Sequence, residues 1–104
     1  MRNDKDNLIV KLSFEFALKI VAYSEEIRQT NRFEMASQIF RSGTSIGANI
    51  REAQNAESKA DEIQYWLAIC KESEFYPNPS EELDQQIQSI NLILSKIISS
   101  SKKA

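Results

Sequence analysis

A chain of 104 residues has room for one domain, and we expect residues 1–104 to form it. Hydrophobic residues make up 41% and charged residues 27%, which is typical of a globular protein and favours neither a disordered nor a membrane-embedded chain. The 13 Lys and Arg residues are interleaved with 15 Asp and Glu residues, so the net charge of −2 argues against a dedicated nucleic-acid binder. The charged N-terminal residues lack the apolar segment of a secretory signal, and we therefore expect a cytoplasmic protein.

The sequence contains no histidine and a single cysteine, Cys70. Without histidine, the chain cannot form the Ser-His-Asp and Cys-His catalytic arrangements or the Glu-x-x-His ligand pairs of di-iron bundles. One cysteine cannot supply a structural zinc site or an internal disulfide, and its place beside aliphatic residues predicts a buried, reduced thiol. Neither glycine lies in a phosphate-binding motif. We therefore predict a protein that is not an enzyme and that binds no cofactor or metal ion.

Residues 4–27 carry apolar side chains at helical spacing, which predicts a first helix. Its main apolar stripe consists of Ile9, Leu12, Phe16, Ile20, Tyr23 and Ile27. A second stripe consists of Val10, Phe14, Ala17 and Val21. Because a helix in a bundle needs only one buried stripe, the second stripe is surplus apolar surface that something must cover.

Residues 33–58 have the periodicity of one long helix, for which Thr30 and Asn31 supply N-cap chemistry. The apolar side of this segment consists of Phe33, Ala36, Ile39, Phe40, Gly43, Ile46, Ile50 and Ala53. The two glycines of the protein, Gly43 and Gly47, lie four residues apart and therefore on one face. Each glycine in a helix interior costs about 1 kcal/mol relative to alanine, so the pair predicts a neighbouring helix that approaches closely.

Ser58 is predicted to cap a third helix, with Asp61 completing a weak capping box. The core positions of this helix are Ala60, Ile63, Leu67 and Cys70. Pro77 and Pro79 then predict a loop, because proline removes a backbone donor and restricts the residue before it. Ser80 opens a fourth helix, in which Leu83, Ile87, Ile90, Leu94 and Ile97 repeat with heptad spacing. Four helices with short connections predict an all-α fold, an antiparallel up-and-down four-helix bundle.

Three residues of the third helix lie away from its core stripe: Tyr65, Trp66 and Ile69. Together with the second stripe of the first helix, they make more apolar surface than we expect one bundle to bury. We interpret these three residues as a candidate oligomer surface, and we predict a homo-oligomer. The alternative is a compact bundle whose wide apolar faces are all buried internally.

A polar stripe runs beside the apolar face of residues 33–58 and consists of Arg41, Ser45, Asn49 and Glu52. One interpretation is a recognition stripe for a peptide, an RNA or a small ligand in a groove between helices. The other is structural: Ser45 allows close helix approach, Asn49 satisfies a backbone group, and Arg41 pairs with a carboxylate on another helix. We favour the structural interpretation, because buried polar groups normally have partners for reasons of stability alone.

The same residues carry a family resemblance, through the segments Arg41-Ser42, Ser45-Ile46, Asn49-Ile50-x-Glu52, Ser58-Lys59 and Tyr65-Trp66-Leu67. In this combination the chain resembles the 23S rRNA-intervening sequence protein family, also called four helix bundle proteins, from about residue 16 to residue 98. The resemblance implies a bacterial antiparallel four-helix bundle that assembles into a homopentamer and has no established enzymatic activity. The family name records where some members are encoded and does not show RNA binding.

We therefore expect a non-enzymatic oligomeric scaffold or binding module, with a protein as the possible partner. The alternative is an RNA-binding accessory factor, since similar bundles include the basic accessory protein of diversity-generating retroelements. The cations that would serve this alternative are Arg41, Arg51, Lys59 and Lys71. The acidic balance of the chain weakens it, because phosphate contacts dominate nucleic-acid affinity.

Overall fold

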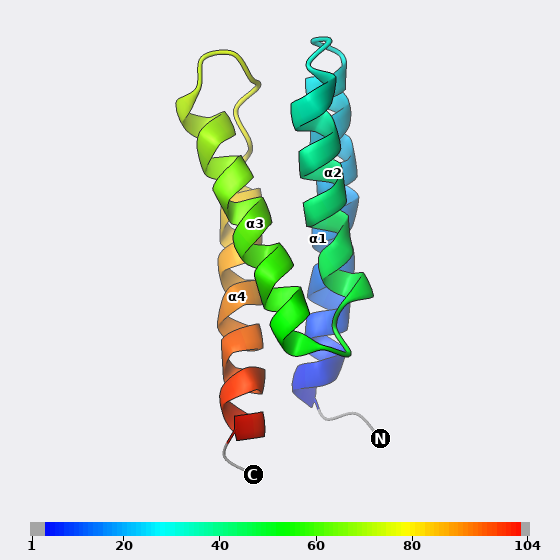
Figure 1. Ribbon diagram of the computed structural model, residues 1–104, viewed down its shortest axis with the longest axis vertical. Helices are drawn as coiled ribbons and strands as arrows, with labels where there is room; N and C mark the ends of the chain where they lie inside the picture. The colour runs from blue at the N-terminus through cyan, green and yellow to red at the C-terminus, as the bar shows by residue number, and fades with distance from the viewer. Residues whose placement is uncertain (1–3, 103–104) are drawn as a thin grey trace.

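The computed structural model describes the backbone of residues 4–102 and the side chains of residues 7–100. It contains four helices: α1 (Asp4–Arg28), α2 (Phe33–Ala48), α3 (Ala53–Glu72) and α4 (Glu81–Lys102). They run alternately up and down (Figure 1), and each helix packs on the next, with α4 returning to α1. Within residues 4–102 there is no strand, so the prediction of an all-α four-helix bundle is confirmed.

The core lies along the bundle axis and is built from the main apolar stripe of each helix. On α1 the stripe at Ile9, Phe16 and Ile20 is fully buried, whereas the second stripe around Phe14 stays outside the core. The heptad positions of α4 face inward as predicted, from Leu83 to Leu94. The fully buried side chains are therefore largely those that the helical periodicity indicates.

Helices α1 and α2 approach each other closely at Gly43. A Cβ atom placed on Gly43 would lie 2.6 Å from Cγ2 of Ile20, which is inside the contact distance of two carbon atoms. One turn further on, a Cβ on Gly47 would lie 3.3 Å from Oγ of Ser13. The α1–α2 seam thus has room for glycine at position 43 and for nothing larger without movement of Ile20.

The prediction of one long helix over residues 33–58 is wrong, because α2 ends at Ala48 and α3 begins at Ala53. Asn49 ends α2: its side-chain Nδ2 donates to the carbonyl oxygen of Ser45 at 2.7 Å, and its backbone N–H donates to Ile46 instead. In a continuing helix the backbone N–H of Asn49 would occupy the Ser45 carbonyl. Since Ile46, Ala53 and Ala60 keep a seven-residue spacing, the apolar pattern continues through this turn and hides it.

Two predicted caps are also wrong. The hydroxyl of Thr30 donates to the carbonyl of Ile27 at 2.6 Å, and Asn31 adopts a left-handed φ of 66°, so both residues terminate α1 and do not cap α2. Ser58 lies inside α3 and does not precede it. The predicted cap of α4 is confirmed, since the backbone N–H of Leu83 donates to Oγ of Ser80 at 3.3 Å.

Candidate functional site

Apolar side chains are exposed along the outer edge of the α1–α2 seam. From α1 they are the second stripe predicted from sequence, with Phe14 64% and Val21 44% exposed. From α2 they include Phe40, which is 43% exposed and therefore does not join the core face to which the sequence pattern assigns it. We call this surface the α1–α2 face, and its members are Val10, Phe14, Ala17, Val21, Phe40, Thr44, Gly47 and Ala48.

A shallow groove of about 230 Å³ runs along this face between the two helices. The side chains of Val10 and Phe14 form its α1 wall, and the α2 wall passes Gly47, which has no side chain. A monomeric protein rarely leaves several large apolar side chains in one exposed row, and such rows usually mark an interaction site. The α1–α2 face therefore has the character of a contact surface.

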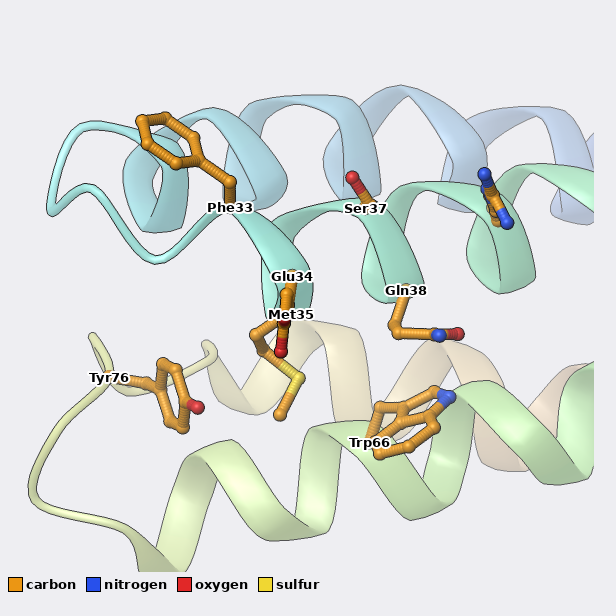
Figure 2. Close-up of a pocket in the computed structure, with 8 residues that line it drawn as sticks. Phe33, Glu34, Met35, Ser37, Gln38, Trp66 and Tyr76 are labelled. Atoms are coloured by element: carbon orange, nitrogen blue, oxygen red, sulfur yellow. The ribbon is translucent and has the colours of Figure 1, made fainter.

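A second hollow, the α2–α3 groove, lies between the N-terminal half of α2, the middle of α3 and the loop that follows α3. Its volume is about 520 Å³. In Figure 2, Met35 points from α2 toward α3 and lies between Tyr76 and Trp66. These three side chains are partly buried against the core, so the floor of the groove is apolar and packed on the core.

The charged groups of the α2–α3 groove lie at the two ends of its α2 wall. Glu34 lies at one end and Arg41 at the other, seven residues and about 10 Å apart along the helix. Opposite them, Nε1 of Trp66 is covered and has no hydrogen-bond partner among the described residues. Figure 2 shows Gln38 beside the nitrogen-bearing edge of the indole. A buried N–H without an acceptor is unusual, because each such group costs about 1–3 kcal/mol.

The four residues of the predicted polar stripe do not form one cluster. Ser45 donates to the carbonyl of Ser42 at 3.1 Å, and Asn49 donates to Ser45, so both serve the backbone of their own helix. Glu52 is exposed immediately before α3. Arg41 lines the α2–α3 groove and forms no ion pair with any carboxylate in the described part of the chain. Arg41 alone thus shares a hollow with an aromatic residue of α3.

The candidate oligomer surface on α3 is divided between the surface and the groove. Tyr65 is 63% exposed, whereas Trp66 and Ile69 are partly buried. The rings of Tyr65 and Trp66 are 5.5 Å apart and inclined by 60°. Trp66 packs on the core with one side and lines the groove with the other, and its role is therefore not limited to an outward-facing patch.

The cations considered for RNA binding are dispersed. Arg41 is in the middle of α2, Arg51 is exposed in the turn after it, and Lys59 and Lys71 lie twelve residues or about 18 Å apart on α3. Lys71 is already paired, with its Nζ 3.4 Å from Oδ2 of Asp84. Within one chain these residues do not make a continuous basic surface.

The thiol of Cys70 is buried and free, as predicted. It lies beside Tyr23, whose hydroxyl donates to the carbonyl of Pro77 at 2.6 Å. Burial raises the pKa of the Tyr23 phenol, and contact with the Cys70 thiol raises it further. Burial also raises the pKa of the Cys70 thiol, and the contact with Tyr23 offsets only part of this effect. Both groups therefore stay protonated at neutral pH, and the Tyr23 hydroxyl ties α1 to the loop before α4.

The described residues hold no group of three or more Cys, Asp or Glu side chains placed to bind a metal ion. Among the same residues, no helix is both long and apolar enough to cross a membrane. The candidate functional features are the α1–α2 face, with its exposed apolar side chains, and the α2–α3 groove. The sequence indicates the first through the second stripe of α1, but it gives no sign of the groove, whose walls come from three separate segments.

Comparison with known proteins supports the family resemblance. Residues 5–96 match the family model described as 23S rRNA-intervening sequence protein. A solved structure from Bacteroides thetaiotaomicron VPI-5482, described as a protein of unknown function from the S23 ribosomal protein family, is similar to this chain with a TM-score of 0.78 and 36% sequence identity. The similarity covers 91% of this chain and 98% of that one. No curated protein matches the sequence. The chain belongs to the 23S rRNA-intervening sequence protein family.

Proposed function

We propose that the protein is a non-enzymatic binding module that works as a homo-oligomer. The observation that carries this proposal is the α1–α2 face, where Phe14 is exposed on the wall of the groove and Val21 and Phe40 are exposed further along the same two helices. Covering such a face with a second copy removes apolar surface from water, at about 25 cal/mol for each Å² buried. The family resemblance gives the number of subunits in this proposal, a homopentamer.

The lack of enzymatic activity is part of the same proposal. The two groups with raised pKa values, Tyr23 and Cys70, are buried and hydrogen-bonded inside the bundle, where they have a structural use. A thiol with a raised pKa is a poor nucleophile, since the thiolate is the reactive form. This arrangement favours a surface-based role over a catalytic one.

The test of self-association is the mass of the protein in solution, measured by size-exclusion chromatography with light scattering. We expect a mass several times the 11.9 kDa of one chain for the wild type, near five times that mass for a pentamer. We expect Phe14→Asp to give monomers, because the change places a charge in the centre of the α1–α2 face. Circular dichroism would verify that the variant keeps its helices.

The matched control is Leu92→Asp. Leu92 is 59% exposed, close to the 64% of Phe14, but lies on α4 away from the α1–α2 face. We expect this variant to keep the wild-type mass. A wild type that is monomeric at all concentrations, or a Leu92→Asp variant that dissociates as completely as Phe14→Asp, would contradict the proposal.

RNA binding is the second candidate function, and the observation in its favour is that Arg41 and Arg51 are exposed and free of ion pairs within the described part of the chain. The same chromatography tests it through the absorbance at 260 nm. Nucleic acid that travels with the oligomer at low salt and leaves at high salt would favour an assembly that gathers these cations on one surface. A protein-only spectrum at low salt would remove this candidate.

A further inference from the structure

We infer that the α2–α3 groove binds an acidic peptide segment of a partner protein, with an apolar side chain on the floor and a carboxylate at Arg41. The groove lies outside the α1–α2 face. This inference deepens the binding role proposed above, but it does not depend on self-association. It rests on the shape of the groove, on its hydrogen-bond donors and on its charge.

The shape favours a polypeptide. The groove has about 520 Å³ of space, which is within the range of binding sites, and it is an open furrow along two helices and not an enclosed cavity. Its floor is formed by three side chains that pack against the core: Met35, Trp66 and Tyr76. An apolar side chain of a segment lying along α2 and α3 can bury itself there, as in other helix-lined grooves that bind peptides.

Two hydrogen-bond donors that line the groove, Arg41 and Nε1 of Trp66, have no acceptor among the described residues. Arg41 has only uncharged residues one turn away on its own helix: Ser37, Gln38, Thr44 and Ser45. No described carboxylate comes within 4.0 Å of its guanidinium. Nε1 of Trp66 is a second donor without a partner, and the exposed side chain of Gln38 beside it can turn away to admit one. A carboxylate suits Arg41, because its pairing with arginine is among the strongest hydrogen-bonded contacts. A backbone carbonyl of the same segment can accept from Nε1 of Trp66.

The charge of the groove favours a peptide over RNA. Glu34 lies in the same wall, so a chain of phosphates following the groove would meet a carboxylate about 10 Å from Arg41. A peptide needs only one acid at the Arg41 end and can place an uncharged or basic residue opposite Glu34. This charge complementarity also fixes the direction in which the segment lies.

The only tryptophan of the protein is Trp66, so its fluorescence reports directly on the groove. The probes are an array of peptides of about twelve residues, or three helical turns. Each peptide carries one Asp or Glu near one end, one leucine or phenylalanine at a varied position and uncharged residues elsewhere, and a second array replaces the Asp or Glu by Asn or Gln. We expect saturable changes in Trp66 emission with acidic members and none with their neutral counterparts.

The decisive variant is Arg41→Gln, which we expect to weaken the response by about tenfold or more, because a hydrogen bond to a charged group contributes about 1.5–3 kcal/mol. The matched control is Arg51→Gln, the same change at another exposed arginine that does not line the groove. We expect the control to bind as the wild type does. Equal binding by Arg41→Gln, or no response to any acidic member at about millimolar concentration, would overturn the inference.

Two further measurements test other occupants of the groove, and a third separates this inference from the self-association proposal. A single-stranded oligouridine that changes Trp66 emission while the acidic peptides do not would assign the groove to nucleic acid and overturn the inference. Trp66 emission that changes on dilution of the wild type alone would assign it to a second copy, with the same consequence. The Phe14→Asp protein is expected to respond to the peptides as the wild type does, so failure of the self-association proposal and failure of this inference are read from different measurements.

Discussion

The two ends of the chain form helix pairs with opposite kinds of seam. Between α3 and α4, polar side chains form contacts along the outer edge of the seam. Asn91 donates to Gln64 at 2.9 Å, and Ser95 donates to Glu57 at 3.4 Å. Lys71 forms an ion pair with Asp84 at 3.4 Å. Between α1 and α2 no described side chains form a hydrogen bond or an ion pair across the seam. Its outer edge carries Val10, Phe14 and Phe40 instead.

This difference indicates that the α3–α4 seam is suited to contact with water and the α1–α2 seam to contact with another protein surface. The polar pairs between α3 and α4 add little to stability, since exposed pairs contribute about 0–1 kcal/mol, but they place polar side chains along the line where the two helices meet. Tyr65 and Leu92 are exposed on the same two helices. The α1–α2 seam relies on close backbone approach at Gly43 and leaves its apolar edge open. A bundle with polar contacts along one seam and exposed apolar side chains along the other is suited to association through the apolar seam.

The largest expected effect comes from Gly43→Val, which tests whether close approach holds α1 and α2 together. Even the Cβ of the new side chain would lie 2.6 Å from Ile20, and Ile20 is fully buried and has no space to yield. We expect a loss of about 3 kcal/mol in the free energy of unfolding, measured by urea denaturation at one protein concentration.

Gly47→Ala provides the control for Gly43→Val on the same helix face. Its Cβ would lie 3.3 Å from Oγ of Ser13, whose small side chain can shift, and alanine adds about 1 kcal/mol of helix propensity. We expect a change of about 1 kcal/mol or less in either direction. Equal losses for the two variants would mean that position 43 is not specially confined.

The sequence predicted the four helices and most of the buried residues, because amphipathic periodicity reflects burial directly. It failed at the turn after α2, since Asn49 ends the helix through its side-chain contact with Ser45 while the apolar spacing continues. Asparagine at that position is not a strong signal, because it also occurs inside helices, at a modest cost.

The candidate surfaces were predictable to different degrees. The α1–α2 face follows from the second apolar stripe of a single helix, although Phe40 was assigned to the core. The α2–α3 groove was not predictable, because Met35, Trp66 and Tyr76 come from three segments, and their meeting depends on the packing of α2 against α3. A pattern within one helix can be derived from sequence, but a site between helices needs the tertiary structure.

A smaller effect on stability is expected from Tyr23→Phe, which tests the hydrogen bond between α1 and the loop before α4. The variant loses the hydrogen bond to the carbonyl of Pro77, and we expect about 1 kcal/mol lower stability at pH 7. The exposed Tyr65→Phe is the matched control and should leave stability unchanged.

The pH dependence of Tyr23→Phe sharpens this test. Burial raises the pKa of Tyr23 in the folded protein above its ordinary value of 10.0, so the folded state keeps the proton that the unfolded state releases as the pH rises. The free energy of unfolding should therefore decline above pH 10, by at most about 1.4 kcal/mol per pH unit for this group. Thermal melts at pH 8 and pH 10.5 should show a smaller decline for Tyr23→Phe than for wild type and Tyr65→Phe. Identical declines would mean that Tyr23 titrates alike in both states.

The smallest effect on stability, and the sharpest test of the comparison, is expected from the double variant Gln64→Leu with Asn91→Leu. It removes the hydrogen-bonded pair at the middle of the α3–α4 edge and puts apolar side chains there, so that this edge resembles the α1–α2 face. Because the hydrogen bond between them is exposed and Oδ1 of Asn91 is covered without a partner, we expect stability to change by less than about 1 kcal/mol. We expect light scattering to show a mass above that of the wild type, since the molecule would now have two exposed apolar edges.

A wild-type mass for this variant would show that an exposed apolar edge alone is not sufficient for association. The role of the α1–α2 face would then depend on the groove beside Gly47 as well as on its apolar side chains.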